Sequence, residues 1–548
     1  MTGYRPPRFP TPVDLDLSRN EGRPTISGLD LTEEALVSLT SRYPDTTALR
    51  AVVARRHGLL EGQVLITAGG DDALLRCFLR ARGPVAATTP GFEMIRHYSD
   101  QVGASLIEVS WWGGDFPIGE FLEVDAAMAV IVSPNNPTGS VVSSSDLRNV
   151  ADAFPLVVLD AAYSEFADED LTPAALEMGN VVVVRTLSKA FGLAGLRVGY
   201  LLGPEQLVAE IGAFGSPYAV SALSATLAAD LLETGVERAD DFARLIATER
   251  DRLIAVLEDL GVGALESQAN FVLASGVDPD WVVPAMASLG IGLRSFPDRP
   301  ELEGCVRITL PGDPLDFARL VAALRTVLDP EALLFDMDGV LADVRGSFRS
   351  AIVATAAGYG VEVTTGQILA AKAAGNASDD WELTHGLLAA AGVDATFEEV
   401  RESFEVLYQG SETTPGLKTA ERLIPDRATL AAWSDRMPLG IVTARPRRDA
   451  EAFLERFGVD DCFATVIARE DAPSKPDPAP VRLALESLGV TRAWMSGDTR
   501  DDIDSARGAG VVPIGVLVPG DDPTTLSGAA RIVASVAEIQ EVLDVTTG

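Results

Sequence analysis

Short, almost wholly apolar segments recur along this chain and constrain its fold more than any other feature. Each is long enough for a buried strand, and helical patterns such as DALLRCFLRAR (72–82) lie between them. Strands that alternate with helices are joined by right-handed crossovers, so the pattern predicts an α/β fold built on a parallel sheet. The expected strands of the first half span 63–69, 84–90, 126–134, 155–163 and 180–188.

A second series of apolar segments begins near residue 331 and predicts a second parallel sheet. The stretch 345–418 has Ala-rich helical periodicity and no strong strand signal, so we expect an inserted helical cap there. Because 548 residues are too many for one hydrophobic core, we expect separate domains that meet near Asp329–Pro330, after the helical pattern at 313–328. The expected strands of the second half span 331–343, 437–446, 464–471, 492–499 and 511–520.

The net charge and the spacing of the cysteines limit which binding partners and which cellular compartment we expect. A net charge of -36 argues against a nucleic-acid or anionic-membrane partner, because phosphate binding needs clustered Lys and Arg. We find no apolar run typical of a membrane span and no secretory signal at the start. Cys77, Cys305 and Cys462 lie far apart without CxxC spacing, which argues against disulfides and zinc. We therefore expect a cytoplasmic protein.

Lysine is rare in this chain, which has 44 Lys and Arg residues together but only Lys189, Lys372, Lys418 and Lys475 as lysines. An amine can lose its proton and act as a nucleophile, whereas a guanidinium cannot. Lys189 follows the expected strand at 180–188, and functional groups of parallel sheets collect at the carboxyl ends of strands. Lys189 is therefore a candidate nucleophile.

The residues at neighbouring strand ends suit a pyridine aldehyde cofactor. Lys189 can form a Schiff base with its aldehyde, and a buried Asp160 can keep the ring nitrogen protonated. Tyr163 and Asn136 can reach its phenolic oxygen. Taken singly, each motif also has a structural interpretation, as a turn or a helix cap.

The same strand ends supply donors for a phosphate. Backbone N–H groups at a helix N-terminus bind anions, and hydroxyl and guanidinium groups add further donors. The candidate residues are Gly69, Gly70, Asp71, Thr186, Ser188 and Arg197.

These motifs resemble those of pyridoxal-phosphate aminotransferases of the aspartate aminotransferase fold, and in particular of histidinol-phosphate aminotransferases. The resemblance covers about 15–327 and implies a large, mainly parallel-sheet domain at about 40–240, with a small α/β domain formed from both ends of 1–328. It is carried by RYPD (42–45), GGDDA, PGFEMIRHY (90–98), SPNNPTG (133–139), DAAYSEF (160–166), TLSKAFGLAGLRVGY (186–200), SPYAVS (216–221), QANFVL (268–273) and RITLPG (307–312).

The resemblance implies further roles at matching positions. Phe92 is expected to stack on pyridoxal 5′-phosphate, and Tyr43 to reach the phosphate of a neighbouring subunit's cofactor, which implies a homodimer. Arg307, helped by Arg294, is expected to bind the anionic group of each substrate. Asn20 lies in RNEGRP (19–24), a segment expected to touch substrate. That segment lacks the aromatic of the family's NENP-Y pattern, so transamination is better supported than an imidazole substrate.

DMDGVL (336–341) places two carboxylates at the end of an expected strand. One of these two carboxylates, Asp336 and Asp338, can attack phosphorus, while the other can protonate the leaving oxygen and later deprotonate water. Such crowding of carboxylates invites Mg²⁺. DxDG alone could equally be a turn or a calcium loop, but Thr443, Lys475 and the pair Asp498 and Asp502 follow in order.

This order resembles that of haloacid dehalogenase-type hydrolases over about 331–545. The resemblance implies a Rossmann-like core at 331–344 and 419–548 with a helical cap at 345–418. It implies Asp336 as the nucleophile and Asp338 as the acid and base. It also implies Thr443 and Lys475 as phosphoryl binders. Lys372 and Asn376 in the cap are either substrate contacts or, on the better supported interpretation, solvated helix surface. The metal ligands expected for Mg²⁺ are Asp336, Asp338, Asp498 and Asp502.

The two halves together suggest consecutive reactions on a small phosphorylated molecule. We expect glutamate-dependent amination of a phosphorylated ketone, such as imidazole-acetol phosphate, and hydrolysis of the resulting phosphorylated amine to an amino alcohol such as histidinol; in the reverse direction 2-oxoglutarate is the acceptor. Three alternatives stay open. They are a related amine of specialised metabolism, a decarboxylase like the threonine-phosphate decarboxylases, and a degenerate binding module in one half.

Overall fold

The chain forms two compact units. The computed structural model describes residues 7–9, 11–23, 32–373, 380–411 and 413–546. Most of the first unit is Asp16–Val277 with Leu293–Arg319, and most of the second is Leu320–Gly548 with Asp278–Gly292. Among the described residues, no helix combines the length and apolar character needed to cross a membrane.

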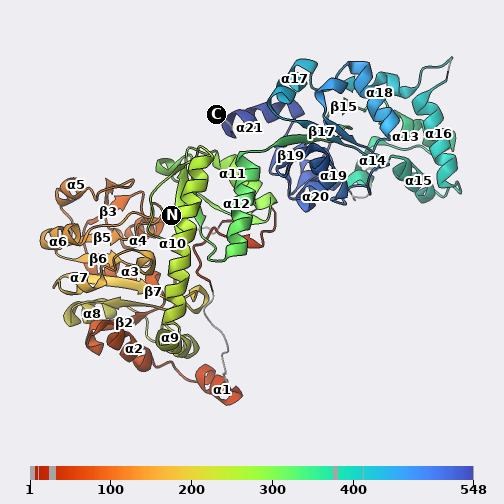
Figure 1. Cartoon of the computed structure of the whole chain (residues 1–548). Coiled ribbons are helices and arrows are strands. Elements are labelled where there is room, and N and C mark those ends of the chain that lie inside the picture. Colours follow the sequence, from red (N-terminus) through yellow and green to blue (C-terminus); the bar gives the residue numbers. More distant parts are fainter. Residues whose placement is uncertain (1–6, 10, 24–31, 374–379, 412, 547–548) are drawn as a thin grey trace. The chain divides into compact units, whose positions relative to one another are not determined.

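The first unit contains a seven-stranded sheet in the order β2-β8-β7-β6-β5-β3-β4 (Figure 1). Only β8 runs antiparallel to its neighbours, and all five strands expected in this half are present. Two strands of this sheet were not predicted from the sequence: β4, which is a half-exposed edge strand, and β8, which has only four residues. The strands are β2 (Val64–Thr67), β3 (Val85–Thr89), β4 (Leu106–Ser110), β5 (Met128–Val132), β6 (Val157–Asp160), β7 (Val181–Thr186) and β8 (Gly199–Leu202).

Helices that pack on this sheet share its apolar core. α3, which includes all but the last residue of the helical pattern expected at 72–82, buries Leu74, Cys77 and Phe78 against valines of β6 and β7. The helices of this part of the chain, whether or not they pack on the sheet, are α1 (Glu33–Ser41), α2 (Thr47–His57), α3 (Gly70–Ala81), α4 (Glu93–Val102), α5 (Ile118–Leu122), α6 (Ser144–Ala153), α7 (Thr172–Leu176), α8 (Glu205–Gly212), α9 (Ala222–Thr234) and α10 (Val236–Asp259).

A smaller antiparallel sheet in the order β12-β13-β10-β9 carries two arginines of the expected substrate site. Its register pairs Arg294 with Arg307, so both side chains come from adjacent strands. The short strands around this part of the chain are β1 (Leu15–Asp16), β9 (Gly263–Ala264), β10 (Phe271–Ser275), β11 (Ile291–Gly292), β12 (Arg294–Ser295) and β13 (Cys305–Thr309).

The second unit contains a wholly parallel sheet in the order β18-β17-β14-β19-β20-β21. The five strands expected in this half are confirmed, and β21 is additional. The elements are β14 (Ala332–Phe335), β17 (Leu439–Val442), β18 (Thr465–Ile467), β19 (Ala493–Gly497), β20 (Val512–Val516), β21 (Arg531–Val533), α17 (Arg427–Arg436), α18 (Arg447–Phe457), α19 (Ala479–Leu488), α20 (Arg500–Gly508) and α21 (Ile539–Thr546).

The insertion between β14 and β17 is helical, as expected (Figure 1). It has its own apolar core. β15 and β16 pair antiparallel at its base, where the chain leaves the sheet and returns to it. Lys372 lies in α14, where its side chain is not described, and Asn376 falls outside the described residues. The elements are β15 (Ala342–Asp343), α13 (Phe348–Gly358), α14 (Thr365–Ala373), α15 (Asp380–Ala390), α16 (Phe397–Gln409) and β16 (Arg422–Leu423).

Two buried tryptophans join helices of the first sequence half to the second sheet. Trp281 of α11 (Pro279–Ser288) packs on Trp494 of β19, with ring centroids 4.6 Å apart. The Trp494 indole N–H donates to the carbonyl of Thr326, in α12 (Pro314–Leu328), at 2.9 Å. The second unit therefore begins before the sequence boundary near Asp329–Pro330.

We predict that Trp494→Ala destabilises the second unit by about 3 to 5 kcal/mol, because it removes a buried ring and leaves a buried carbonyl without its donor. Urea unfolding followed by circular dichroism measures the effect. Trp112→Ala is the matched control, since Trp112 is 40% exposed, and should change stability by less than about 0.5 kcal/mol. Equal effects of the two substitutions would contradict this role for Trp494.

Candidate active sites

A cavity of about 720 Å³ lies in the first unit, at the carboxyl ends of its central strands. Gly69 and Tyr43 are the only site residues expected in this half that do not line it. The expected residues that line the cavity are Asn20, Gly70, Asp71, Phe92, Asn136, Asp160, Tyr163, Thr186, Ser188, Lys189, Arg197, Arg294 and Arg307.

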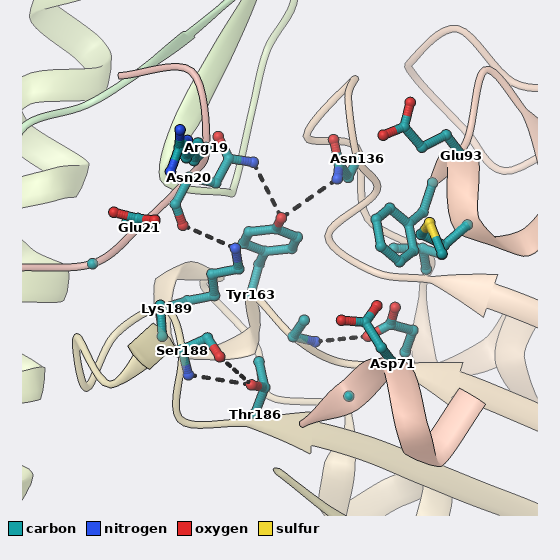
Figure 2. A pocket seen from close by; sticks show the side chains of 18 of the residues that line it. Arg19, Asn20, Glu21, Asp71, Glu93, Asn136, Tyr163, Thr186, Ser188 and Lys189 are labelled. Atoms are coloured by element: carbon teal, nitrogen blue, oxygen red, sulfur yellow. Dashed lines mark hydrogen bonds between the residues drawn. The ribbon is translucent and has the colours of Figure 1, made fainter. Parts of the chain in front are cut away.

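Lys189 projects into this cavity from the loop after β7 (Figure 2). Its Nζ donates to the carbonyl oxygen of Asn20 at 2.9 Å and lies 5.6 Å from the centre of the Tyr163 ring. A Cβ atom at Gly22 would lie 1.5 Å from the Lys189 carbonyl oxygen, so only glycine permits this close approach. The segment around RNEG thus packs directly against the lysine loop.

Polar groups around Tyr163 link the cofactor residues to Arg307. The Tyr163 hydroxyl accepts from Asn20 Nδ2 at 3.1 Å and from Asn136 Nδ2 at 3.5 Å (Figure 2). Arg307 Nη1 donates to Asn136 Oδ1, and its Nη2 donates to the carbonyl oxygen of Ser18, both at 2.8 Å. Arg307 is buried, so its cation offers strong attraction to an anion in the cavity.

Asp160 ends β6 with only 4% of its surface exposed, and burial raises the pKa of its carboxyl to about 7. Its Oδ1 accepts from the Ala162 N–H at 3.2 Å. A buried carboxylate that faces a cavity fits a protonated ring nitrogen, because that cation would supply both charge and a hydrogen-bond donor. The residues present therefore fit pyridoxal phosphate at its ring.

The donors expected for the cofactor phosphate also lie together. Gly69 precedes α3 with φ of 85°, and a Cβ there would approach Arg197 Nη2 to 3.0 Å. Arg197 pairs with Asp71 at 3.1 Å, and Thr186 Oγ1 donates to Ser188 Oγ at 2.9 Å. A helix N-terminus with hydroxyl groups and a half-exposed guanidinium beside it fits a phosphate group.

Glu93 is a cavity residue that the sequence analysis did not identify. It is the first residue of α4, and both its carboxylate oxygens accept from Arg294 Nη2, at 3.2 and 3.3 Å. Figure 2 shows it on the Asn136 side of the cavity. The signal available in the sequence was a charged residue directly after Phe92.

Tyr43 lies outside the cavity lining. Its side chain is 81% exposed and stacks on Tyr218, with ring centroids 4.6 Å apart. A tyrosine so exposed is available to another chain.

In the second unit, Asp336, Asp498 and Asp502 bring carboxylate oxygens within 4.8 Å of one another. Oxygen donors at this spacing fit a hard divalent cation such as Mg²⁺. Gly339 has a φ of 79°, and a Cβ there would lie 2.1 Å from Asp498 Oδ2, which explains the glycine of DMDGVL. This cluster holds three of the four carboxylates expected to bind metal.

Lys475 lies among these carboxylates. Its Nζ donates to Asp336 Oδ1 at 2.6 Å, to Asp502 Oδ1 and to the Val442 carbonyl oxygen at 3.1 Å. Burial raises the pKa of Asp336 to about 7 despite the ammonium beside it. Burial also opposes the charge of Lys475, but the two carboxylates raise its pKa above the usual value. Thr443 is buried just beyond β17, whose last residue is Val442.

Asp338 faces a different partner. Its Oδ1 accepts from Arg445 Nε at 2.7 Å, and Arg445 also pairs with Glu421 at 3.0 Å. The sequence analysis identified neither Arg445 nor Glu421. Arg445 stands two residues after Thr443 and could have been suspected, whereas Glu421 carries no local signal.

Two family models match successive parts of the chain. Residues 28–324 match the model of the aminotransferase class I and II family, and residues 330–510 match that of haloacid dehalogenase-like hydrolases. A histidinol-phosphate aminotransferase of Thermoanaerobacter pseudethanolicus is 34% identical over 280 residues, which are 49% of this chain and 79% of that protein.

Two further proteins resemble parts of the chain. An imidazoleglycerol-phosphate dehydratase of Phytophthora nicotianae is 47% identical over 197 residues, which are 34% of this chain and only 44% of that protein. The crystal structure of histidinol-phosphate aminotransferase from Sinorhizobium meliloti, in complex with pyridoxal-5′-phosphate, superposes with a TM-score of 0.50 at 25% identity. It covers 57% of this chain and 90% of that one.

We predict that Lys189→Ala and Lys189→Arg both abolish covalent attachment of pyridoxal phosphate, because neither replacement supplies a nucleophilic amine. The visible absorption of the loaded protein should disappear, and borohydride should no longer fix the cofactor to the chain. Lys418→Ala is the control, since Lys418 binds Gln409 in the second unit, and it should keep the attachment. Mapping the fixed cofactor to any other lysine would contradict the assignment.

Proposed function

Because the chain belongs to the class I and II aminotransferase family and carries a haloacid dehalogenase-like hydrolase domain after it, we propose that it aminates a phosphorylated ketone and then hydrolyses the phosphate ester of the product. Glutamate is the amino donor. The ketone is imidazole-acetol phosphate or a close analogue, the amine is histidinol phosphate, and the final product is the free amino alcohol. The two reactions share one phosphorylated intermediate.

The observation that carries this proposal is that one polypeptide holds two groups of buried residues that each suit a phosphate ester. The cavity of the first unit holds a buried arginine, Arg307, apart from the donors for the cofactor phosphate. The second unit holds a buried nucleophile, Asp336, with a lysine and a cluster of metal-binding carboxylates. The names of the similar proteins, histidinol-phosphate aminotransferase and imidazoleglycerol-phosphate dehydratase, both denote enzymes of imidazole phosphate esters, which supports the imidazole substrate.

In the aminotransferase half, the chain's own residues bind the cofactor and move protons. The cofactor, when bound, supplies an electron-withdrawing ring that stabilises the charge left when the substrate loses its Cα proton. Asp160 holds a proton at the ring nitrogen, and Tyr163 with Asn136 orients the phenolic oxygen. The Nζ of Lys189, as a free amine, would take the proton from the substrate Cα.

Arg307 explains how one site accepts two different substrates. A carboxylate and a phosphate are both compact anions that a guanidinium binds through two hydrogen bonds, so Arg307 can hold either. The remainder of each substrate then lies toward Arg294 and Glu93. Arg294 provides a cation for the second carboxylate of glutamate, and Glu93 provides acceptors for a donor group such as an imidazole N–H.

In the hydrolase half, Asp336 attacks the phosphorus atom and Asp338 protonates the leaving oxygen. Lys475 and Thr443 bind the phosphoryl oxygens. Asp336, Asp498 and Asp502 would hold Mg²⁺, whose charge offsets the repulsion between the carboxylate and the phosphate. Water then hydrolyses the phosphoaspartate, with Asp338 as the base.

We propose that the active form is a homodimer. α1 buries none of its side chains, and Leu36, Val37, Tyr43 and Tyr218 are all exposed. Tyr43 and Tyr218 stack on each other, and exposed apolar side chains that lie together favour contact with another protein. A second copy would cover them and bring Tyr43 to the cofactor phosphate of its partner.

A coupled assay tests the proposed sequence of reactions. Incubation with histidinol phosphate and 2-oxoglutarate should yield both glutamate and inorganic phosphate. Lys189→Ala should lose glutamate formation by more than about 1,000-fold and keep phosphate release, and Asp336→Asn should do the reverse. Arg427→Gln, which removes an exposed ion pair with Asp461, should keep both. If the wild type forms neither glutamate nor inorganic phosphate, histidinol phosphate is excluded as a substrate.

Tyr43 tests the dimer. Tyr43→Phe should raise the dissociation constant of pyridoxal phosphate by about 10- to 100-fold, because it removes a hydrogen bond to a charged group. Tyr359→Phe, in the helical insertion, is the control and should leave the constant unchanged. The proposal fails if sedimentation shows a monomer at assay concentrations or if both variants bind the cofactor like the wild type.

A further inference from the structure

Arg445 is a charged side chain in the second unit that is buried on every side, with 2% of its surface exposed. Its Nε donates to Asp338 Oδ1 at 2.7 Å, and its Nη2 lies 2.5 Å from the same oxygen. Its Nη1 donates to Glu421 Oε2 at 3.0 Å. The guanidinium therefore bridges two carboxylates, one of them the proposed acid and base of phosphate hydrolysis.

Glu421 connects this bridge to the helical insertion. It is 3% exposed, and its Oε1 accepts from Ser347 Oγ at 2.9 Å and from the Tyr408 hydroxyl at 3.0 Å. Ser347 stands directly before α13, the first helix of the insertion, and Tyr408 stands near the end of α16, the last. Glu421 itself lies where the chain returns to the sheet. The network thus touches both connections between insertion and sheet.

Two aromatic rings hold the guanidinium in this position. The Arg445 guanidinium carbon lies 5.0 Å from the ring centre of Phe348, in α13, and 5.3 Å from that of Phe453, in α18. Both distances are within the range of cation–π attraction. A guanidinium with two carboxylate partners and two ring faces has little freedom to move, so it restricts the rotation of Asp338.

We propose that Arg445, held by Glu421, is a positioning residue that orients the Asp338 carboxyl group for proton transfer, and that it links this orientation to both connections of the helical insertion. The inference rests on the proposed phosphatase activity. With Oδ1 held by the guanidinium, Oδ2 of Asp338 is the oxygen that carries the transferable proton.

The proton inventory of the reaction explains why this position needs a cation. As Asp336 forms its bond to phosphorus and the ester P–O bond breaks, the leaving oxygen takes the proton from Asp338 Oδ2 and departs as an alcohol. Asp338 is then a carboxylate, and Arg445 stabilises the new charge at 2.7 Å. Asp338 next takes a proton from the water that attacks the phosphoaspartate. Phosphate leaves, and both aspartates return to their starting states.

A comparison of leaving groups separates positioning from a general structural role. An alkyl phosphate such as glycerol 2-phosphate needs a proton on its leaving oxygen, whereas p-nitrophenyl phosphate releases a stable phenolate without one. For Arg445→Gln, we expect kcat/KM to fall by about 100-fold on glycerol 2-phosphate and by less than about fivefold on p-nitrophenyl phosphate. In a protein that already carries Asp338→Asn, Arg445→Gln should lower kcat/KM by less than about a further threefold on either ester.

Two further variants complete the experiment. Glu421→Gln keeps the shape of the side chain but weakens the hold on Arg445, so it should show the same selective loss to a smaller degree, even if Arg445→Gln folds poorly. Arg427→Gln is the matched control, an arginine of the same unit whose ion pair with Asp461 is exposed, and it should leave both esters unaffected.

Equal losses on the two esters for Arg445→Gln and Glu421→Gln would overturn the inference, because a structural defect lowers both reactions alike. The inference would also be overturned if the losses of kcat/KM caused by Arg445→Gln and Asp338→Asn were fully additive in the double variant. A wild type that hydrolyses neither of these esters nor histidinol phosphate would instead contradict the proposed phosphatase activity itself, and the inference would fall with it.

Discussion

The carboxyl ends of parallel strands lie at one edge of a sheet, and both sites of this chain depend on that constraint. Residues separated by dozens of positions become neighbours when each one follows a different strand of the same sheet. In the first unit, Asn136, Asp160 and Thr186 come from or follow β5, β6 and β7, and all line one cavity. In the second, Asp336 and Asp498 follow β14 and β19, which pair directly. Loops could not hold these groups as closely, because only the sheet fixes the spacing of their ends.

Burying carboxylates at the edge of a sheet is electrostatically unfavourable, and the two units stabilise these carboxylates in different ways. Burial raises the pKa of Asp160 and of Asp336 to about 7 in each case. Asp336 has a cation of its own, because Lys475 donates to it at 2.6 Å. Asp160 accepts a backbone hydrogen bond instead, and it faces a cavity that a cationic ring can enter. The lysine beside Asp336 suits a nucleophile that must stay ionised. The open cavity beside Asp160 suits a carboxylate whose partner is a cofactor.

Much of the fold could be predicted from the sequence, because buried strands of a parallel sheet are continuous apolar runs. Strand β7, VVVVRT, is readable from six residues alone. The missed strands fail this test for physical reasons: β4 is a half-exposed edge strand that contains Glu108, and β8 has only four residues within a motif that was read for its chemistry. Most of the candidate site could also be predicted, since glycines, lysine and carboxylates at strand ends are local signals. Glu93 had only its place directly after Phe92 as a signal, and Glu421 had none, because a single glutamate is ordinary in any helix or loop.

What the sequence by itself determined is the order of strands and helices and the identity of the candidate site residues at strand ends, because both depend on windows of a few residues. The tertiary structure alone decided which charges meet. Arg445 and Asp338 are 107 residues apart, and Trp494 and Thr326 are 168 apart. The packing of whole helices and strands determines which residues become such partners. A buried charge or indole N–H is stable only where that packing places a complementary group beside it. No local pattern encodes that choice.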